Sequence, residues 1–175
     1  MKWIAEAPPE RKARLAGAVY ALVFVAGGYA LADRNPTAGL VAGVLYIAVT
    51  LLFYDLFKPV NRRLSFIAAA VSLAGIAAGP LLHVNPLPIF GAYCLLIGYL
   101  IFRSTFLPRA LGALMAFGGL GWLTFLSASL ASRLSPYNYA PGLIGEGALT
   151  LWLLAAGVDA PKWTSMKTAD TRIHA

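Results

Sequence analysis

The segment that decides the fold is residues 64–102, which read LSFIAAAVSLAGIAAGPLLHVNPLPIFGAYCLLIGYLIF and contain no Asp, Glu, Lys or Arg. A membrane-spanning helix needs roughly 20 predominantly apolar residues. At 39 residues the segment is too long for one crossing, and HVNPLP at 83–88 places two helix-breaking prolines near its centre. We therefore expect two transmembrane helices joined by a short turn.

The rest of the chain repeats this pattern of long uncharged stretches between short basic segments. Mean hydropathy is +0.72 and only 12% of the residues are charged, which is outside the range of a water-soluble domain. We expect an all-α integral membrane protein, a bundle of six transmembrane helices within residues 14–158. The expected spans are 15–32, 36–57, 64–82, 89–102, 110–132 and 141–158.

The basic residues predict the orientation, because Lys and Arg in short loops favour the cytoplasmic side. With the N-terminus inside, only Arg34 and Arg133 of the fourteen Lys and Arg residues fall outside. Both termini are therefore expected in the cytoplasm, as an N-terminal segment 1–13 and a C-terminal tail 159–175. The alternative is a signal peptide cleaved after ALA at 30–32, but its apolar run of 18 residues is long for a signal core.

Composition also excludes several classes of function. The net charge of +7 comes from short basic clusters between apolar runs, which indicates contact with anionic lipid headgroups and no nucleic acid. The single cysteine, Cys94, and the two histidines, His83 and His174, form no metal-binding pattern, so we expect neither a metal nor a cofactor. Membrane lipids are the expected partners.

Acidic residues inside the spans are the main functional candidates, because a charge at mid-bilayer costs roughly 2.5 to 3.5 kcal/mol. Glu146 lies inside the last expected span, between Gly145 and Gly147, with no basic residue within ten positions. It needs a partner from another helix, and it serves either in proton or cation binding or as a satisfied structural carboxyl. The basic candidates for its partner are Arg34, His83 and Arg133.

Four other residues are weaker candidates. Asp55 is expected near the cytoplasmic end of the second span, where it can pair with Lys58 one turn later, and an exposed pair of this kind contributes little stability. His83 ends the third span, where a hydrogen bond to a headgroup is a sufficient account and a proton-linked role is the alternative. Arg103 and Arg109 are expected to hold the inner ends of the fourth and fifth spans at phosphate headgroups.

Small residues recur within the expected spans. Gly39 and Gly43 have GxxxG spacing, as do Gly75 and Gly79, and three glycines fall within 118–121. Such faces let helix backbones approach closely. We expect them to pack helices within the bundle, with a homodimer contact as the alternative.

Six segments carry a family resemblance: ARLAG at 13–17, PVNR at 59–62, GYLIFRS at 98–104, LPRALG at 107–112, GE at 145–146, and LWLL at 151–154. In these the chain resembles an uncharacterised bacterial membrane family catalogued as domain of unknown function 4386. Trp122 departs from the pattern, since a tyrosine is common there. The resemblance implies an integral membrane protein of bacterial type, expected in the inner membrane, and it assigns no substrate, cofactor or reaction.

Short loops and a single buried acid favour a small transport component or an accessory subunit of a membrane assembly. Its partners would then be other membrane subunits or a second copy of the chain. One alternative is an intramembrane enzyme or lipid-modifying protein that uses Glu146, although no nucleophile or metal set is recognisable. Another is a membrane sensor module, which would need a partner that supplies the output.

Overall fold

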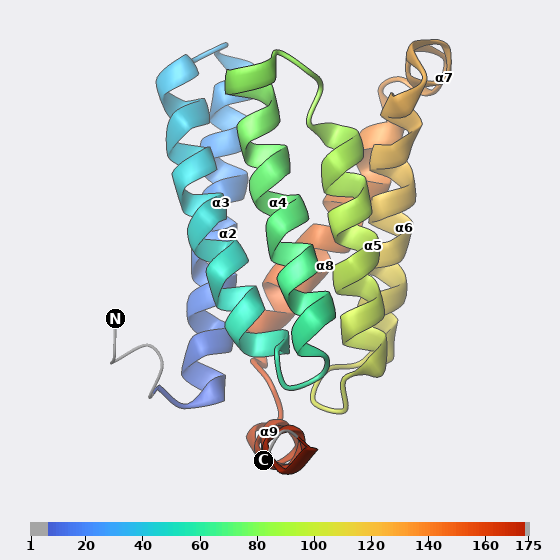
Figure 1. The fold of residues 1–175 in the computed structure, drawn as a ribbon. Coiled ribbons are helices and arrows are strands. Elements are labelled where there is room, and N and C mark those ends of the chain that lie inside the picture. Colours follow the sequence, from blue (N-terminus) through green and yellow to red (C-terminus); the bar gives the residue numbers. More distant parts are fainter. Residues whose placement is uncertain (1–6, 174–175) are drawn as a thin grey trace.

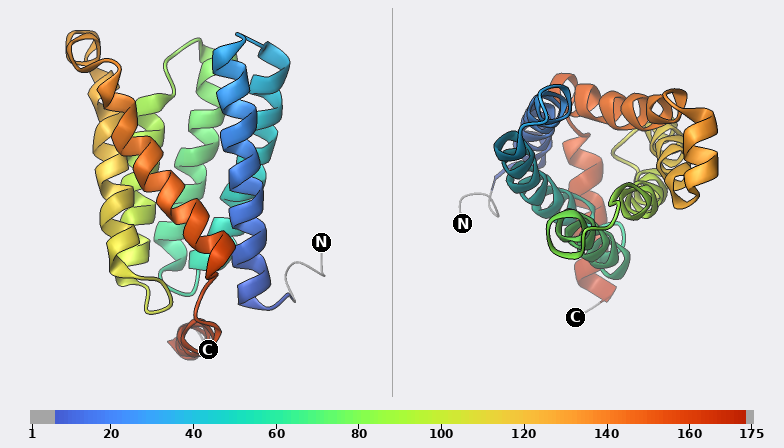
Figure 2. Two further views of the ribbon diagram at one scale, coloured as in Figure 1. Left: turned by 180° about the vertical axis from the view of Figure 1, so that it is seen from behind. Right: turned by 90° about the horizontal axis from the view of Figure 1, so that it is seen from above.

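The computed structural model describes residues 7–173, in which helices are the only regular secondary structure. The helices that run along the bundle axis are α2 (Pro9–Ala32), α3 (Pro36–Phe57), α4 (Arg62–Leu82), α5 (Leu87–Arg103), α6 (Arg109–Leu123) and α8 (Ala140–Ala155) (Figure 1). Each packs on the next along the chain, and the tilted α8 packs on both α6 and α2 (Figure 2). The helices therefore close into a ring.

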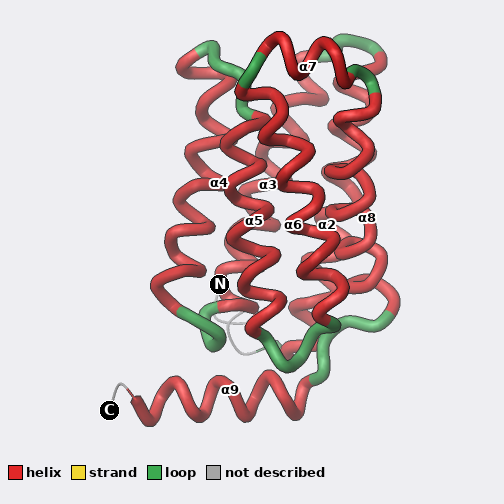
Figure 3. Tube along the Cα trace, turned by 90° about the vertical axis from the view of Figure 1, so that its right-hand side faces the viewer, coloured by secondary structure: helices red, strands yellow, loops and turns green. Residues whose placement is uncertain are grey.

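Shorter elements cover the two ends of the ring. One end carries η1 (Thr124–Leu126), α7 (Ala128–Leu134) and η2 (Tyr137–Tyr139). At the other end, α9 (Ala160–Ile173) crosses beneath the bundle, and α2 begins on this side (Figure 3). These are called the α7 end and the α9 end below.

The outside of the ring is apolar, as a lipid-facing surface must be. Large apolar side chains are exposed on each bundle helix, among them Val25, Val44, Phe66, Phe102, Leu120 and Leu151. An apolar surface of this extent is unusual for a soluble monomer and normal in lipid. The chain is thus an all-helical membrane protein.

Four described helices are long and apolar enough to span a membrane: Pro9–Ala30, Pro36–Phe57, Arg62–Leu82 and Arg109–Leu126. A fifth is obtained if Tyr137–Ala155 and Ala160–Ala169, which meet at a 103° bend, are counted as one span. Helix α5 is apolar but shorter, with 17 residues. Six crossings with both termini in the cytoplasm remain a prediction.

Short polar turns set the ends of the central helices. Asn35 and Asn61 precede α3 and α4, and their side-chain oxygens accept hydrogen bonds from Ala38 N at 3.1 Å and Leu64 N at 2.9 Å. The break expected in the long uncharged segment falls between α4 and α5. There His83 adopts a left-handed conformation, with φ of 55°, and closes α4.

Two regions differ from the expected spans in their structure. The helix expected over 110–132 ends at Leu123, and after η1 the extended Ser127 accepts a hydrogen bond from Leu130 N at 3.3 Å and starts α7. Serine competes for backbone hydrogen bonds in this way, so an uncharged run need not be one helix. Residues expected as a tail form α9, after Gly157 turns the chain with φ of 68°.

Glycines bring α5 and α6 into backbone contact, and Gly119 of the 118–121 cluster, expected to pack helices within the bundle, is one of them. A Cβ atom on Gly98 would lie 2.8 Å from the carbonyl oxygen of Gly112. One on Gly91 would lie 2.9 Å from the carbonyl oxygen of Gly119. No side chain larger than hydrogen fits at these crossings without moving the helices apart.

Candidate functional site

Glu146 lies on the face of α8 that points into the ring, and it is only 8% exposed. Side chains from three other helices contact its carboxyl group. The Tyr20 hydroxyl of α2 donates to Oε2. The Trp122 indole N–H of α6 donates to Oε1 at 2.6 Å, and the Cys94 thiol of α5 donates to the same oxygen at 3.7 Å. Glu146 therefore ties together four of the helices in the ring.

These partners are neutral, unlike the basic partners that the sequence suggested. Arg34 and His83 lie in turns and Arg133 lies on α7, and none of them contacts the carboxyl. Among the residues that the structure describes, no Lys or Arg forms an ion pair with Glu146. The lack of a nearby base indicated that another helix supplies the partner, but no sequence pattern singled out the aromatic donors.

Two glycines let the donors reach the carboxyl. Gly17 lies one turn before Tyr20, and a Cβ atom there would be 2.8 Å from the backbone nitrogen of α8 at Leu154. Gly142 lies one turn before Glu146, and a Cβ atom there would be 2.1 Å from Cζ2 of the Trp122 indole. The bare backbone at both positions thus allows α2 and the indole to lie directly against α8.

Aromatic rings enclose the side of the site that faces α3 and α5. The Tyr46 ring lies edge-on to Tyr20, with centroids 5.6 Å apart, and the two hydroxyl oxygens are 3.3 Å apart. Phe90 and Tyr93 pack on Tyr46 with centroid distances of 5.0 and 6.1 Å. The Tyr93 hydroxyl is buried and has no hydrogen-bond partner in the described chain. The Glu146 site is defined here as Tyr20, Tyr46, Tyr93, Cys94, Trp122 and Glu146.

An apolar groove of about 740 Å³ reaches this site from between α3 and α4. Tyr46 lines the groove and also belongs to the Glu146 site, so its ring separates the groove from the carboxyl. The four GxxxG glycines expected to pack helices also line the groove: Gly39, Gly43, Gly75 and Gly79. A Cβ atom on Gly79 would meet nothing within 4 Å. A Cβ atom on Gly75 would lie 3.3 Å from the Phe90 ring, so Gly75 packs against α5 as expected, whereas Gly79 leaves open space.

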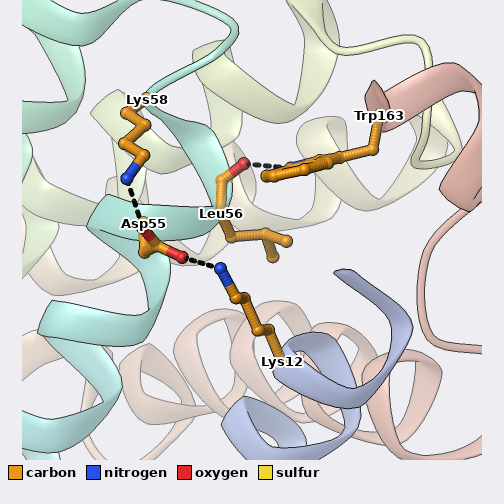
Figure 4. Close-up of polar contacts among 5 residues, drawn as sticks. All are labelled: Lys12, Asp55, Leu56, Lys58 and Trp163. Atoms are coloured by element: carbon orange, nitrogen blue, oxygen red, sulfur yellow. Dashed lines mark hydrogen bonds and ion pairs between the residues drawn. The ribbon is translucent and has the colours of Figure 1, made fainter. Parts of the chain in front are cut away.

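A second polar cluster lies at the α9 end (Figure 4). Asp55 pairs with Lys58, as expected, and also with Lys12 of α2 at 2.6 Å, and Lys12 is only 4% exposed. Trp163 of α9 donates its indole N–H to the carbonyl of Leu56 at 2.9 Å, and the Lys12 ammonium lies 5.8 Å from its ring centroid. The cluster thus joins α2, α3 and α9.

The remaining candidates lie apart from Glu146. Arg103 ends α5 and Arg109 begins α6, both exposed at the α9 end, where the Arg109 guanidinium lies 6.0 Å from the Phe102 ring. His83 is exposed in the turn after α4, toward the α7 end. No group of three or more His, Cys, Asp or Glu that could hold a metal occurs within the described residues.

Comparison with known proteins confirms the family resemblance. Residues 82–157 match the model of a family described as "Domain of unknown function (DUF4386)". The matched region includes Trp122 and Glu146 but not Tyr20 or Tyr46. The chain is also 24% identical over 148 residues to an uncharacterized protein of Archaeoglobus fulgidus, a similarity that covers 73% of this chain and 89% of that protein. No solved structure matches the chain.

Proposed function

We propose that this membrane protein is a transport component in which Glu146 takes up and releases a proton. The observation that supports this most is a buried carboxyl held by three neutral donors and, among the described residues, by no cation. A permanently ionised carboxylate in apolar surroundings would be expected to have a cationic partner. A carboxyl held by neutral groups can exist in either protonation state, and acids of this kind serve as proton relays in membranes.

The hydrogen-bond chemistry indicates which oxygen carries the proton. The Trp122 indole N–H can only donate, so Oε1 must accept in both protonation states. Oε2 faces the Tyr20 hydroxyl, which can either donate or accept. If Oε2 is protonated, it donates to Tyr20, and Tyr20 turns its own O–H toward the Tyr46 hydroxyl 3.3 Å away. Each hydrogen bond that is lost when Oε2 is protonated is therefore replaced by another.

The same two hydroxyls connect the carboxyl to the groove. Tyr20 contacts Oε2, Tyr46 contacts Tyr20, and Tyr46 lines the groove wall. The titratable groups that face Glu146 are Tyr20, Tyr46, Tyr93 and Cys94. Since Glu146 is the most acidic of these by type, it is the group that exchanges a proton in this site.

Infrared difference spectroscopy on the protein in lipid tests this proposal. Raising the pH should remove the carbonyl band of one protonated carboxylic acid, and this band should be missing from Glu146→Gln. Asp55→Asn is the matched control and should keep the band, because Asp55 is paired with two lysines. Absence of any pH-dependent carboxyl band while the protein stays folded, or a band that survives in Glu146→Gln, contradicts the proposal.

One observation favours an enzyme as the second candidate. The Cys94 thiol, a potential nucleophile, lies 3.7 Å from Oε1 of Glu146, a potential base. Cys94→Ala separates the two functions, because it removes the nucleophile and leaves Tyr20 and Trp122 on the carboxyl. If the chain is a transport component, Cys94→Ala should keep both transport activity and the infrared band of Glu146. If the chain is an enzyme that uses this nucleophile, Cys94→Ala should lose its activity.

A further inference from the structure

We infer that the transported molecule is a hydrophobic organic cation, which enters the Glu146 site sideways from the bilayer through the groove between α3 and α4. This inference rests on the proposed role of Glu146 in proton exchange. It adds the chemical class of the cargo and its route.

The charge of the cargo follows from the composition of the site. Glu146 is the only carboxyl in it, and its present partners carry no positive charge. The rings of Tyr46 and Tyr93 pack on each other within this site, and an aromatic face attracts a cation, most strongly where water is excluded. The spare Tyr93 hydroxyl adds a buried oxygen. An anion would be repelled by Glu146, and a neutral molecule would leave the carboxylate uncompensated.

The apolar character of the cargo follows from the groove. Its volume of about 740 Å³ falls within the roughly 300–1,000 Å³ typical of sites for small organic molecules. Leu40, Ile47, Ile76 and Phe90 are among its walls, and no Lys, Arg, Asp or Glu lines it in the described chain. Most of the cargo surface must therefore be apolar, and such a molecule partitions into the bilayer that α3 and α4 face.

Tyr46 is placed to act as the gate between the groove and the carboxyl. It is 9% exposed, it lines the groove, and it is held by the Tyr20 hydroxyl on one side and the Phe90 ring on the other. Rotation of its ring would open the path to Glu146. The arriving cation then pairs with the carboxylate, and the proton on Oε2 leaves through the tyrosine hydroxyls. One cation enters for each proton released, so the charge of the site does not change.

Tetraphenylphosphonium and decyltrimethylammonium are suitable probes, because neither carries an exchangeable proton. Binding to the purified full chain in lipid nanodiscs is measured by equilibrium dialysis, and proton release is measured in parallel with a pH indicator in weak buffer. We expect saturable binding of at least one probe with about one proton released per cation. Glu146→Gln should bind at least about tenfold more weakly and release no proton.

Filling the groove tests the route. Gly43→Leu and Gly79→Leu place side chains in it where a Cβ atom meets ordinary contact or open space, so the fold should tolerate them. Both should weaken probe binding while keeping the infrared band of Glu146. Gly28→Leu is the matched control, since Gly28 is exposed on α2, has open space around it and does not line the groove. It should bind the probes as the unaltered protein does.

The outcomes separate this inference from the proposed function. If the infrared band is present but neither probe binds saturably, the cation inference is overturned and the proton role stands. Binding that persists in Glu146→Gln overturns the assignment of the cation to this site. Binding that is unchanged in both Gly43→Leu and Gly79→Leu overturns the groove as the route. Absence of any pH-dependent carboxyl band from the unaltered, folded protein overturns both proposals.

Discussion

Tyr20→Phe removes the hydroxyl that donates to Glu146 and leaves the buried ring in place. The carboxyl then keeps Trp122 and Cys94 on Oε1 but loses its donor on Oε2. A buried acceptor left without its partner costs about 1–3 kcal/mol in soluble proteins. Hydrogen bonds between membrane helices average about 0.6 kcal/mol and reach about 1.7. Because the partner is a carboxyl, we expect a loss of about 1–2 kcal/mol in the free energy of unfolding.

Tyr93→Phe makes the same chemical change beside the same carboxyl, and we expect a different result. The Tyr93 hydroxyl is as buried as that of Tyr20 but has no hydrogen-bond partner in the described chain. Its removal should leave the free energy of unfolding unchanged or raise it by up to about 1 kcal/mol. Tyr29→Phe, at a position 53% exposed on α2, should change it by less than about 0.5 kcal/mol.

Reversible unfolding in mixed micelles gives these differences. Helicity is followed by circular dichroism as the fraction of dodecyl sulfate rises, and the midpoints are compared across the three variants. Equal losses for Tyr20→Phe and Tyr93→Phe would refute the reasoning, because burial alone would then explain both. No loss for Tyr20→Phe would show that its hydrogen bond to Glu146 contributes nothing to stability.

Three further changes test the packing around the site and at the α9 end. Gly142→Ala should cost about 1–3 kcal/mol in the same unfolding assay, since its Cβ atom would overlap an indole, whereas Gly147→Ala, with open space around it, should cost nothing. Lys12→Met should cost about 1–3 kcal/mol, between the values of exposed and buried ion pairs, and Asp55→Asn in the same chain should recover part of it. Trp163→Phe loses a hydrogen bond to α3, so amide hydrogen exchange in α9 should accelerate while exchange in the bundle helices stays the same.

Composition and hydropathy were sufficient to predict an all-helical membrane protein, because the lipid bilayer that surrounds the chain dictates both. The bounds of α3 coincide with the expected 36–57, since an asparagine cap and a proline stand at its start and the run carries no charge before Asp55. The end of α6 was not predictable in the same way. Ser127 is as compatible with a helix as with a cap, and the choice depends on what the surrounding chain packs against.

The sequence could predict the central residue of the candidate site but not its partners. Glu146 was recognisable from its rarity inside an apolar run, but its main partners come from three other helices, and Tyr20 is 126 residues away. Their approach depends on bare backbone at Gly17 and Gly142, and a glycine in a membrane helix signals close packing without naming the neighbour. GxxxG spacing illustrates the ambiguity, since in α4 Gly75 packs against α5 whereas Gly79 of the same pair leaves open space in the groove.

Backbone contact between α5 and α6 bears on the order in which the chain assembles during biosynthesis. The two helices are neighbours in sequence, and their glycine crossings at Gly98–Gly112 and Gly91–Gly119 need no third helix. This hairpin can therefore pair as soon as both segments have entered the bilayer, whereas the contact between α2 and α8 must wait for almost the entire chain. A nascent chain released before α8 would hold a paired hairpin without Glu146, so the Glu146 site could not yet have formed.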